Sequence, residues 1–235
     1  MTGHEWAKWA SWATWESFDP ASIPTKDDRP ELETWLDRIP EKSALLDLGC
    51  GAGGVSRRLV ERGFAVVGVD INEQALSRAR ETAPGAKFYR RNVASAGGLA
   101  LEEAPFDGVV CQLVLSIVGG PEERRSLLEN ARRALAPRGY LYLSASGVSG
   151  DINPAYRRRY EEDFPKTGER YTYFSRDEQG NVLYRTHHFE EQELTRLLEE
   201  AGFEVLEIRK KRETSSRRPG EAAFFFYASC RSKLE

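Results

Sequence analysis

The chain has 235 residues, 40% of them hydrophobic and 30% charged, so a sizeable core is expected and wholesale disorder is not. Its formal net charge of -3 gives no general attraction to nucleic acid or to an anionic membrane. The three cysteines are widely separated and form no CxxC pair, which argues against a disulfide framework and a zinc site. No leader peptide and no apolar run long enough to span a bilayer is found, so we expect a cytoplasmic protein with no membrane partner.

The N-terminal segment is unusually aromatic. On a helix, steps of three residues fall short of a full turn, so rings repeated at that spacing spread around the cylinder. Residues 1–40 are therefore predicted to contain a helical segment that either packs as ordinary core or forms a lid over a pocket. Prolines predict a loop over residues 19–30, and a short helix is predicted over 31–38. The aromatic residues at this spacing are Trp6, Trp9, Trp12, Trp15 and Phe18.

Residues 45–55 carry the strongest motif of the chain. An apolar run is followed by three alternating glycines and then by the helical spacing of Val55, Leu59 and Val60, which predicts a strand, a tight turn and a helix. A turn almost free of side chains lets a ligand approach the backbone, and the helix N-terminus aims its amides at that ligand.

Strands and helices alternate beyond this turn. Helices are predicted after Asn72, a favourable N-cap residue, and from Pro121, because proline is tolerated in a first turn. The alternation predicts a parallel sheet covered by helices on both faces. Strands are predicted over residues 64–69, 87–90, 106–111 and 140–144.

Residues 145–186 interrupt this alternation. They are rich in Tyr, Arg and Glu, with a helix predicted over 154–164 and a hairpin turn over 177–181. An insertion at this point lies above the carboxyl ends of the strands, where open α/β sheets bind ligands, so we predict a substrate cap on a domain spanning 41–235. A helix over 190–201 and two strands, 203–208 and 222–229, complete the chain, joined by a basic turn over 209–218.

The glycine turn also satisfies G-x-G-x-x-G through Gly49, Gly51 and Gly54, so an NAD(P)-binding dehydrogenase or another nucleotide-binding protein is one alternative. Asp47 argues against this alternative, because a pyrophosphate gains nothing from a nearby negative charge. A ligand with an ammonium group and no phosphate suits Asp47 better. Asp70, at the end of the next strand, could accept hydrogen bonds from ribose hydroxyls in either case.

Taken together, these motifs resemble the class I S-adenosylmethionine-dependent methyltransferases, in particular their small-molecule branch. The resemblance implies an α/β, Rossmann-like, doubly wound sheet of seven strands with the last strand antiparallel. It also implies S-adenosylmethionine as methyl donor, with S-adenosylhomocysteine as product. The segments that carry it are 45–53, 66–70, 106–113, 131–143 and 189–208.

The resemblance assigns cofactor contacts residue by residue. Asp70 would hold the ribose hydroxyls and Ile71 would pack on adenine. Asn92 departs from the family, which often has Asp there. Arg29 would pair with the cofactor carboxylate, unless it is a solvated loop residue. The full set is Asp47, Gly49, Cys50, Gly51, Gly53, Asp70, Ile71, Asn92, Val93, Gln112 and Arg29.

Methyl transfer from a sulfonium is an in-line displacement with a good leaving group, so positioning supplies much of the catalysis. A base is needed only if the acceptor must lose a proton. His187 and His188 are candidates for a general base or for substrate positioning, and a structural capping role is the alternative. Candidate substrate-binding residues are Trp12, Trp15, Tyr156, Tyr160 and Tyr173, and no metal is expected.

The predicted function is methyl transfer to an oxygen or nitrogen atom of a small molecule by a monomer or homodimer. The alternative is an RNA or protein methyltransferase that uses the basic hairpin over 209–218, although nucleic acid is a less favoured partner for an acidic chain. No Asn/Asp-Pro-Pro-Tyr/Phe follows the predicted fourth strand, which counts against amino-methylation of DNA bases.

Overall fold

A computed structural model describes residues 12–20, 30–215, 218 and 220–234. Its centre is a seven-stranded sheet in the order β3-β2-β1-β4-β5-β9-β8. All neighbouring pairs are parallel except those of β9, which runs antiparallel to both β5 and β8. The sequence-based prediction of a Rossmann-like sheet with its last strand antiparallel is confirmed. The strands are β1 (Ala44–Leu48), β2 (Ala65–Asp70), β3 (Lys87–Arg90), β4 (Phe106–Gln112), β5 (Leu135–Gly147), β8 (Phe203–Thr214) and β9 (Ala222–Ser232).

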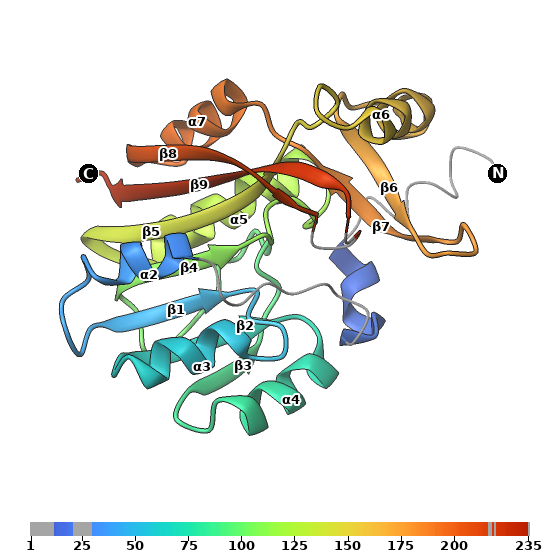
Figure 1. Cartoon of the computed structure of the whole chain (residues 1–235). Coiled ribbons are helices and arrows are strands. Elements are labelled where there is room, and N and C mark those ends of the chain that lie inside the picture. Colours follow the sequence, from blue (N-terminus) through green and yellow to red (C-terminus); the bar gives the residue numbers. More distant parts are fainter. Residues whose placement is uncertain (1–11, 21–29, 216–217, 219, 235) are drawn as a thin grey trace.

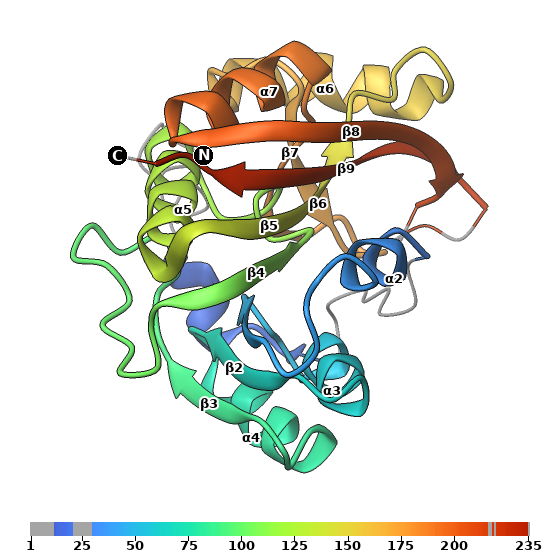
Figure 2. The ribbon, with the colours of Figure 1, turned by 90° about the vertical axis from the view of Figure 1, so that its left-hand side faces the viewer.

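Helices cover both faces of the sheet (Figures 1 and 2). One face carries α5 (Pro121–Ala134) and α7 (Glu191–Glu200), whose buried leucines join the larger core cluster. The other face carries α2 (Pro30–Leu36), α3 (Gly54–Glu61) and α4 (Glu73–Thr82). No helix of the described residues is long and apolar enough to cross a bilayer.

The predicted N-terminal segment divides into two parts with different surroundings. Leu32, Trp35 and Leu36 of α2 are buried in the core, so this helix is part of the body. The 3₁₀ helix η2 (Trp12–Ser17) instead lies beside the carboxyl ends of the parallel strands (Figure 1). Trp6 and Trp9 lie outside the described residues.

The inserted segment lies at the same end of the sheet as η2 (Figure 1). It contains α6 (Pro154–Thr167) and a separate two-stranded sheet of β6 (Thr172–Arg176) and β7 (Val182–His187). Asp163 of α6 is fully buried and ties the helix to β6, accepting from the Phe174 N–H at 2.9 Å and from Arg176 Nη2 at 2.7 Å. We refer to residues 145–186 as the cap.

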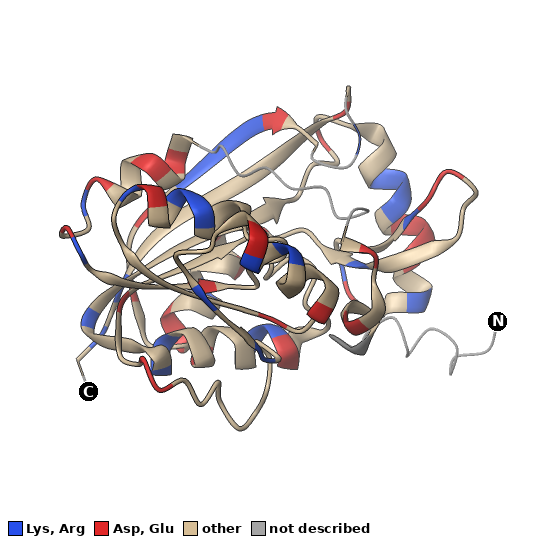
Figure 3. Ribbon diagram, turned by 90° about the horizontal axis from the view of Figure 1, so that it is seen from below, with Lys and Arg blue, Asp and Glu red and all other residues tan. Residues whose placement is uncertain are grey.

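The basic turn predicted over 209–218 is wrong in its first half. β8 continues to Thr214, and its residues Arg209 to Arg212 pair with β9. The ammonium of Lys210 lies 4.2 Å from the centre of the Phe224 ring, and Lys211 forms an ion pair with Glu31 of α2. Charged side chains that cover aromatic neighbours are typical of an edge strand. They replace the alternation of apolar and polar residues by which a strand is recognised in the sequence. Basic and acidic residues are interspersed along the ribbon of the described residues (Figure 3).

Candidate functional site

The glycine turn is held against β2 by its own backbone. The N–H groups of Gly49 and Cys50 both donate to the Val69 carbonyl, at 2.8 and 3.0 Å. Gly49 has φ +79°, and a Cβ there would lie 2.5 Å from Val114 Cγ2, so no other residue fits without displacement. Gly53, with φ +83°, is the N-cap of α3.

Asp70 closes this turn from the end of β2. Its Oδ2 accepts from the Gly51 N–H and its Oδ1 from the Asn72 N–H, each at 2.9 Å. Burial raises the pKa of Asp70, while hydrogen bonds from Asn72, Gly51 and Ile71 lower it in part. A Cβ added to Gly51 would meet no atom within 4 Å, so the turn faces open space at this point.

Two further groups define the chemistry beneath the turn. Asp47 is 2% exposed and accepts from Ser56 Oγ at 2.6 Å. Burial raises the pKa of the Cys50 thiol, and the negative charges of Asp47 and Asp70 raise it further. Cys50 therefore remains a neutral thiol at physiological pH.

A cavity of about 220 Å³ connects the glycine turn with the cap. We call the lining residues within 47–93 the turn half of the cavity. Trp15 and the lining residues within 146–225 form the cap half. The loop after β4 lies in the lining between them. The turn half, together with Gln112 at the end of β4, includes nine of the eleven predicted cofactor residues: Asp47, Gly49, Cys50, Gly51, Asp70, Ile71, Asn92, Val93 and Gln112. Gly53 caps α3 outside this lining, and Arg29 lies outside the described residues.

The cap half is largely aromatic. Tyr156 and Tyr173 line it as predicted candidates, and Tyr184, Phe225 and Arg218 line it without having been singled out in the sequence. A signal for Phe225 existed in β9, because Ala223 and Phe225 are two residues apart and so share one face of the strand. Arg218 gave no signal beyond its place in a basic run.

Trp15 lies in this lining, and both its backbone and its ring are held. Its Nε1 donates to the Ile117 carbonyl at 3.0 Å, and its ring centre lies 4.7 Å from that of Tyr184. Asn72 Nδ2 donates to the carbonyls of Trp15 and Phe18, at 2.9 and 2.7 Å, while its Oδ1 caps α4. One residue beside Asp70 thus links η2 to the turn half. The side chain of Trp12 lies outside the described residues.

His188 lines the cavity and is 3% exposed. Its Nδ1 lies 2.7 Å from the Tyr160 hydroxyl, and its Nε2 lies 3.4 Å from the Tyr173 hydroxyl. The Tyr160 oxygen also accepts from the Ser149 N–H at 3.2 Å. Burial, together with the positive charges of Arg159 and Arg218, lowers the pKa of His188 to about 3.

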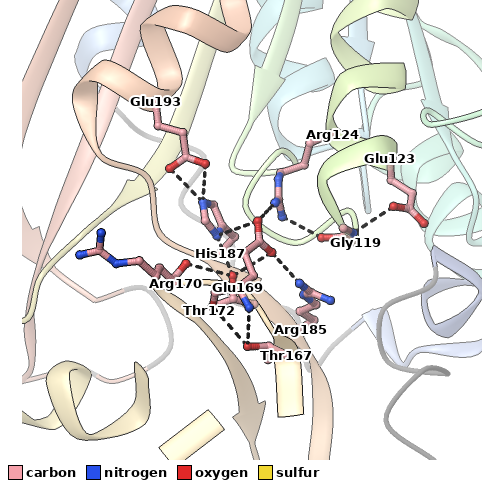
Figure 4. Close-up of polar contacts among 11 residues, drawn as sticks. Gly119, Glu123, Arg124, Thr167, Glu169, Arg170, Thr172, Arg185, His187 and Glu193 are labelled. Carbon is pink, nitrogen blue, oxygen red and sulfur yellow. Dashed lines mark hydrogen bonds and ion pairs between the residues drawn. The ribbon is translucent and has the colours of Figure 1, made fainter. Parts of the chain in front are cut away.

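The structure separates the two histidines. His187 is absent from the cavity lining and lies in a network of charged groups between the cap, α5 and α7 (Figure 4). Its Nε2 bonds Glu193 at 3.0 Å and its Nδ1 bonds Thr172 Oγ1 at 2.7 Å. Tyr160, likewise outside the lining, lies behind His188 as its hydrogen-bond partner.

The network around His187 contains a carboxylate–imidazole group with spacing suitable for a metal ion: Glu169, His187 and Glu193. Glu169, however, forms ion pairs with Arg124 and Arg185 (Figure 4). Two guanidinium groups beside a prospective ligand repel a cation and occupy its oxygens. The residues present therefore fit an ion-pair network better than a metal site.

The comparison with known families agrees with this geometry. The sequence model of the methyltransferase domain family matches residues 25–208, most of the chain. A solved structure of an S-adenosylmethionine-dependent methyltransferase from Methanosarcina mazei is 32% identical, with a TM-score of 0.80, over 89% of this chain and 100% of that one. This chain belongs to the class I S-adenosylmethionine-dependent methyltransferases.

Curated methyltransferases of this family share shorter stretches with the chain. The 2-methyl-6-phytyl-1,4-hydroquinone methyltransferase of Synechocystis is 32% identical over 112 residues, which are 46% of this chain and 34% of that protein. A ubiquinone biosynthesis O-methyltransferase of Idiomarina loihiensis is 34% identical over 102 residues, which are 43% of this chain and 41% of that protein. The chain thus spans less than half the length of these two methyltransferases.

Proposed function

We propose that this chain transfers a methyl group from S-adenosylmethionine to an oxygen or nitrogen atom of a small molecule. The observation that carries the proposal is the single cavity that joins the turn half to the cap half. S-adenosylmethionine supplies an electrophilic methyl carbon whose bond to sulfur breaks as the bond to the acceptor forms. The two curated relatives support a small-molecule acceptor, because one is named for a hydroquinone and the other for ubiquinone biosynthesis.

The turn half has the donors, acceptors and open space that the cofactor requires. The carboxylate of Asp70 would accept from the ribose hydroxyls, and the open side of Gly51 would let the ligand approach the backbone. Ile71 would pack on adenine. Asn92 Oδ1 accepts from the Ala94 N–H at 2.9 Å, which holds the side chain in place. Asn92 would meet the adenine edge as a neutral group. Asp47 would organise the contacts of the ammonium group.

Calorimetric titration of the purified protein with S-adenosylhomocysteine and, separately, with NAD tests this proposal. We expect binding of S-adenosylhomocysteine and no measurable binding of NAD, because Asp47 lies where a pyrophosphate would need positive charge. Binding of NAD without binding of S-adenosylhomocysteine would contradict the proposal and favour a dehydrogenase.

The cap half would hold the acceptor against Trp15 and the cap tyrosines that line it. His188 is a weak base in this setting, and its Nδ1 and Nε2 lie within hydrogen-bond distance of the Tyr160 and Tyr173 hydroxyls. We therefore assign it to positioning the acceptor rather than to removing a proton. Catalysis then depends on orientation and on exclusion of water, for which a sulfonium donor is well suited.

The state of His188 predicts a pH dependence of stability. Because its folded pKa of about 3 lies below the unfolded value of about 6.5, the unfolded chain binds an extra proton between these values. The free energy of unfolding should therefore decrease as the pH falls below 6.5, and His188 should contribute up to about 1.4 kcal/mol of this decrease per pH unit. Urea unfolding of the wild type and of His188→Asn at pH 6.5 and 5.0 measures it, since an Asn amide is polar but does not titrate in this range. An equal loss of stability in both proteins would contradict a buried neutral His188.

The alternative of an RNA or protein substrate gains little from the geometry. The basic run of β8 is spread along an edge strand, where Lys211 already pairs with Glu31 and Lys210 covers Phe224. Arg209 pairs with Glu207 at 2.6 Å. Among the described basic residues of 209–218, only Arg218 belongs to the cavity lining.

A further inference from the structure

The cap half contains a charged residue, Arg218, to which the proposed function assigns no role. Arg218, 22% exposed, lines the cavity from the loop between β8 and β9. Among the described lining residues the carboxylates are Asp47 and Asp70, and both belong to the turn half. Arg218 is thus the charged residue of the described cap half.

Among the described residues, Arg218 forms a long ion pair with Glu221. Glu221 Oε1 lies 3.9 Å from Arg218 Nε, beyond hydrogen-bond distance. Both Glu221 oxygens instead bond Arg159, at 3.1 and 3.2 Å, in a bidentate pair. The group of Arg159, Arg218 and Glu221 therefore carries one net positive charge at the cavity wall.

Arg218 is also close to the aromatic wall. Its charge lowers the pKa of His188 and acts against the rise in the pKa of Tyr173. Its backbone N–H donates to Ser215 Oγ at 3.3 Å, and the same oxygen accepts from the Tyr156 hydroxyl at 3.1 Å. Arg218 and the rings of the cap thus belong to the lining of one cavity.

These contacts define what the surface recognises. Flat rings on several sides favour a flat ligand, and a guanidinium in a partly desolvated wall forms its strongest hydrogen bonds with a carboxylate or a similar anion. From this placement, and resting on the proposed function, we infer that the methyl acceptor is a planar aromatic compound with an anionic group, which Arg218 binds.

A matched series of ligands tests this inference. Hydroxybenzoates, hydroxynaphthoates and their primary carboxamides are titrated calorimetrically into the protein, with and without S-adenosylhomocysteine. In the wild type we expect acids to bind at least about tenfold more tightly than the matching amides. In Arg218→Gln this preference should disappear, and Arg218→Lys should retain part of it. The affinity for S-adenosylhomocysteine should change by less than about twofold.

The control is Arg158→Gln, because Arg158 is exposed on α6 and is absent from the cavity lining. It should preserve the preference for acids. Equal binding of acids and amides by the wild type, binding of no acid of the series, or a preference that survives in Arg218→Gln would each overturn the inference. Weakened binding of S-adenosylhomocysteine in Arg218→Gln would overturn it too, by assigning Arg218 to the cofactor. Failure of the wild type to bind S-adenosylhomocysteine would count against the proposed function alone, because the ratio of acid to amide affinity is also measured without it.

Discussion

Replacing Glu169 by Gln should lower the free energy of unfolding by about 3–5 kcal/mol, the cost of removing one partner from buried ion pairs. Glu169 forms ion pairs with Arg124, whose side chain is 2% exposed, and with Arg185, whose side chain is 9% exposed. Burial would raise the pKa of Glu169, but the charges of Arg124 and Arg185 and the hydrogen bond from Arg185 act against it, and the pKa lies below its ordinary value. A neutral amide would remove the carboxylate with which both buried guanidinium groups form ion pairs.

Urea unfolding at pH 7 measures this effect, with Glu161→Gln as the control, because Glu161 is an exposed residue of α6. The control should stay within about 0.5 kcal/mol of the wild type. Converting Arg124, Glu169 and Arg185 together to Met should restore most of the stability lost in the single variant, since an apolar cluster avoids the desolvation cost. A change below about 1 kcal/mol in Glu169→Gln would show that the network does not hold the cap to α5.

The fold was predictable where local signals and burial agree. The glycine turn, the N-cap at Asn72 and the strand endings at Asp70 and Gln112 follow directly from side-chain type and spacing. The end of β8 was not predictable in this way. Its basic side chains are solvated on an edge strand or lie over Phe224. The run of charged residues was therefore interpreted as a turn, although its backbone pairs with β9.

The two halves of the site differ in the same respect. Residues of the turn half lie in one continuous motif or at strand ends, so their grouping is set by parallel strand order. Residues of the cap half come from distant segments, and sequence alone does not show which side of each one faces the cavity. His187 and His188 illustrate this limit, because adjacent residues of an extended segment point to opposite sides, one into an ion network and one into the cavity.

Replacing Asp70 by Ala should weaken the binding of S-adenosylhomocysteine by about 1.5–3 kcal/mol, the scale of hydrogen bonds to a charged group. This corresponds to roughly 10–150-fold in Kd. Two effects could contribute, because the carboxylate would accept from the ribose hydroxyls and also holds the N–H groups of Gly51 and Asn72. Calorimetry with Glu73→Ala as the control, an exposed residue of α4, excludes a general effect of lost negative charge.

A ligand without the hydroxyls separates the two effects. The 2′,3′-dideoxy analogue of S-adenosylhomocysteine should bind the wild type less tightly than the natural compound, because it lacks the two ribose hydroxyls that would donate to the Asp70 carboxylate. In Asp70→Ala the two ligands should bind almost equally, and the coupling between residue and hydroxyls is the difference between the two comparisons. If the penalty for the missing hydroxyls were the same in both proteins, Asp70 would act only by holding the glycine turn. In that case the ribose would have to be held by other groups of the turn half.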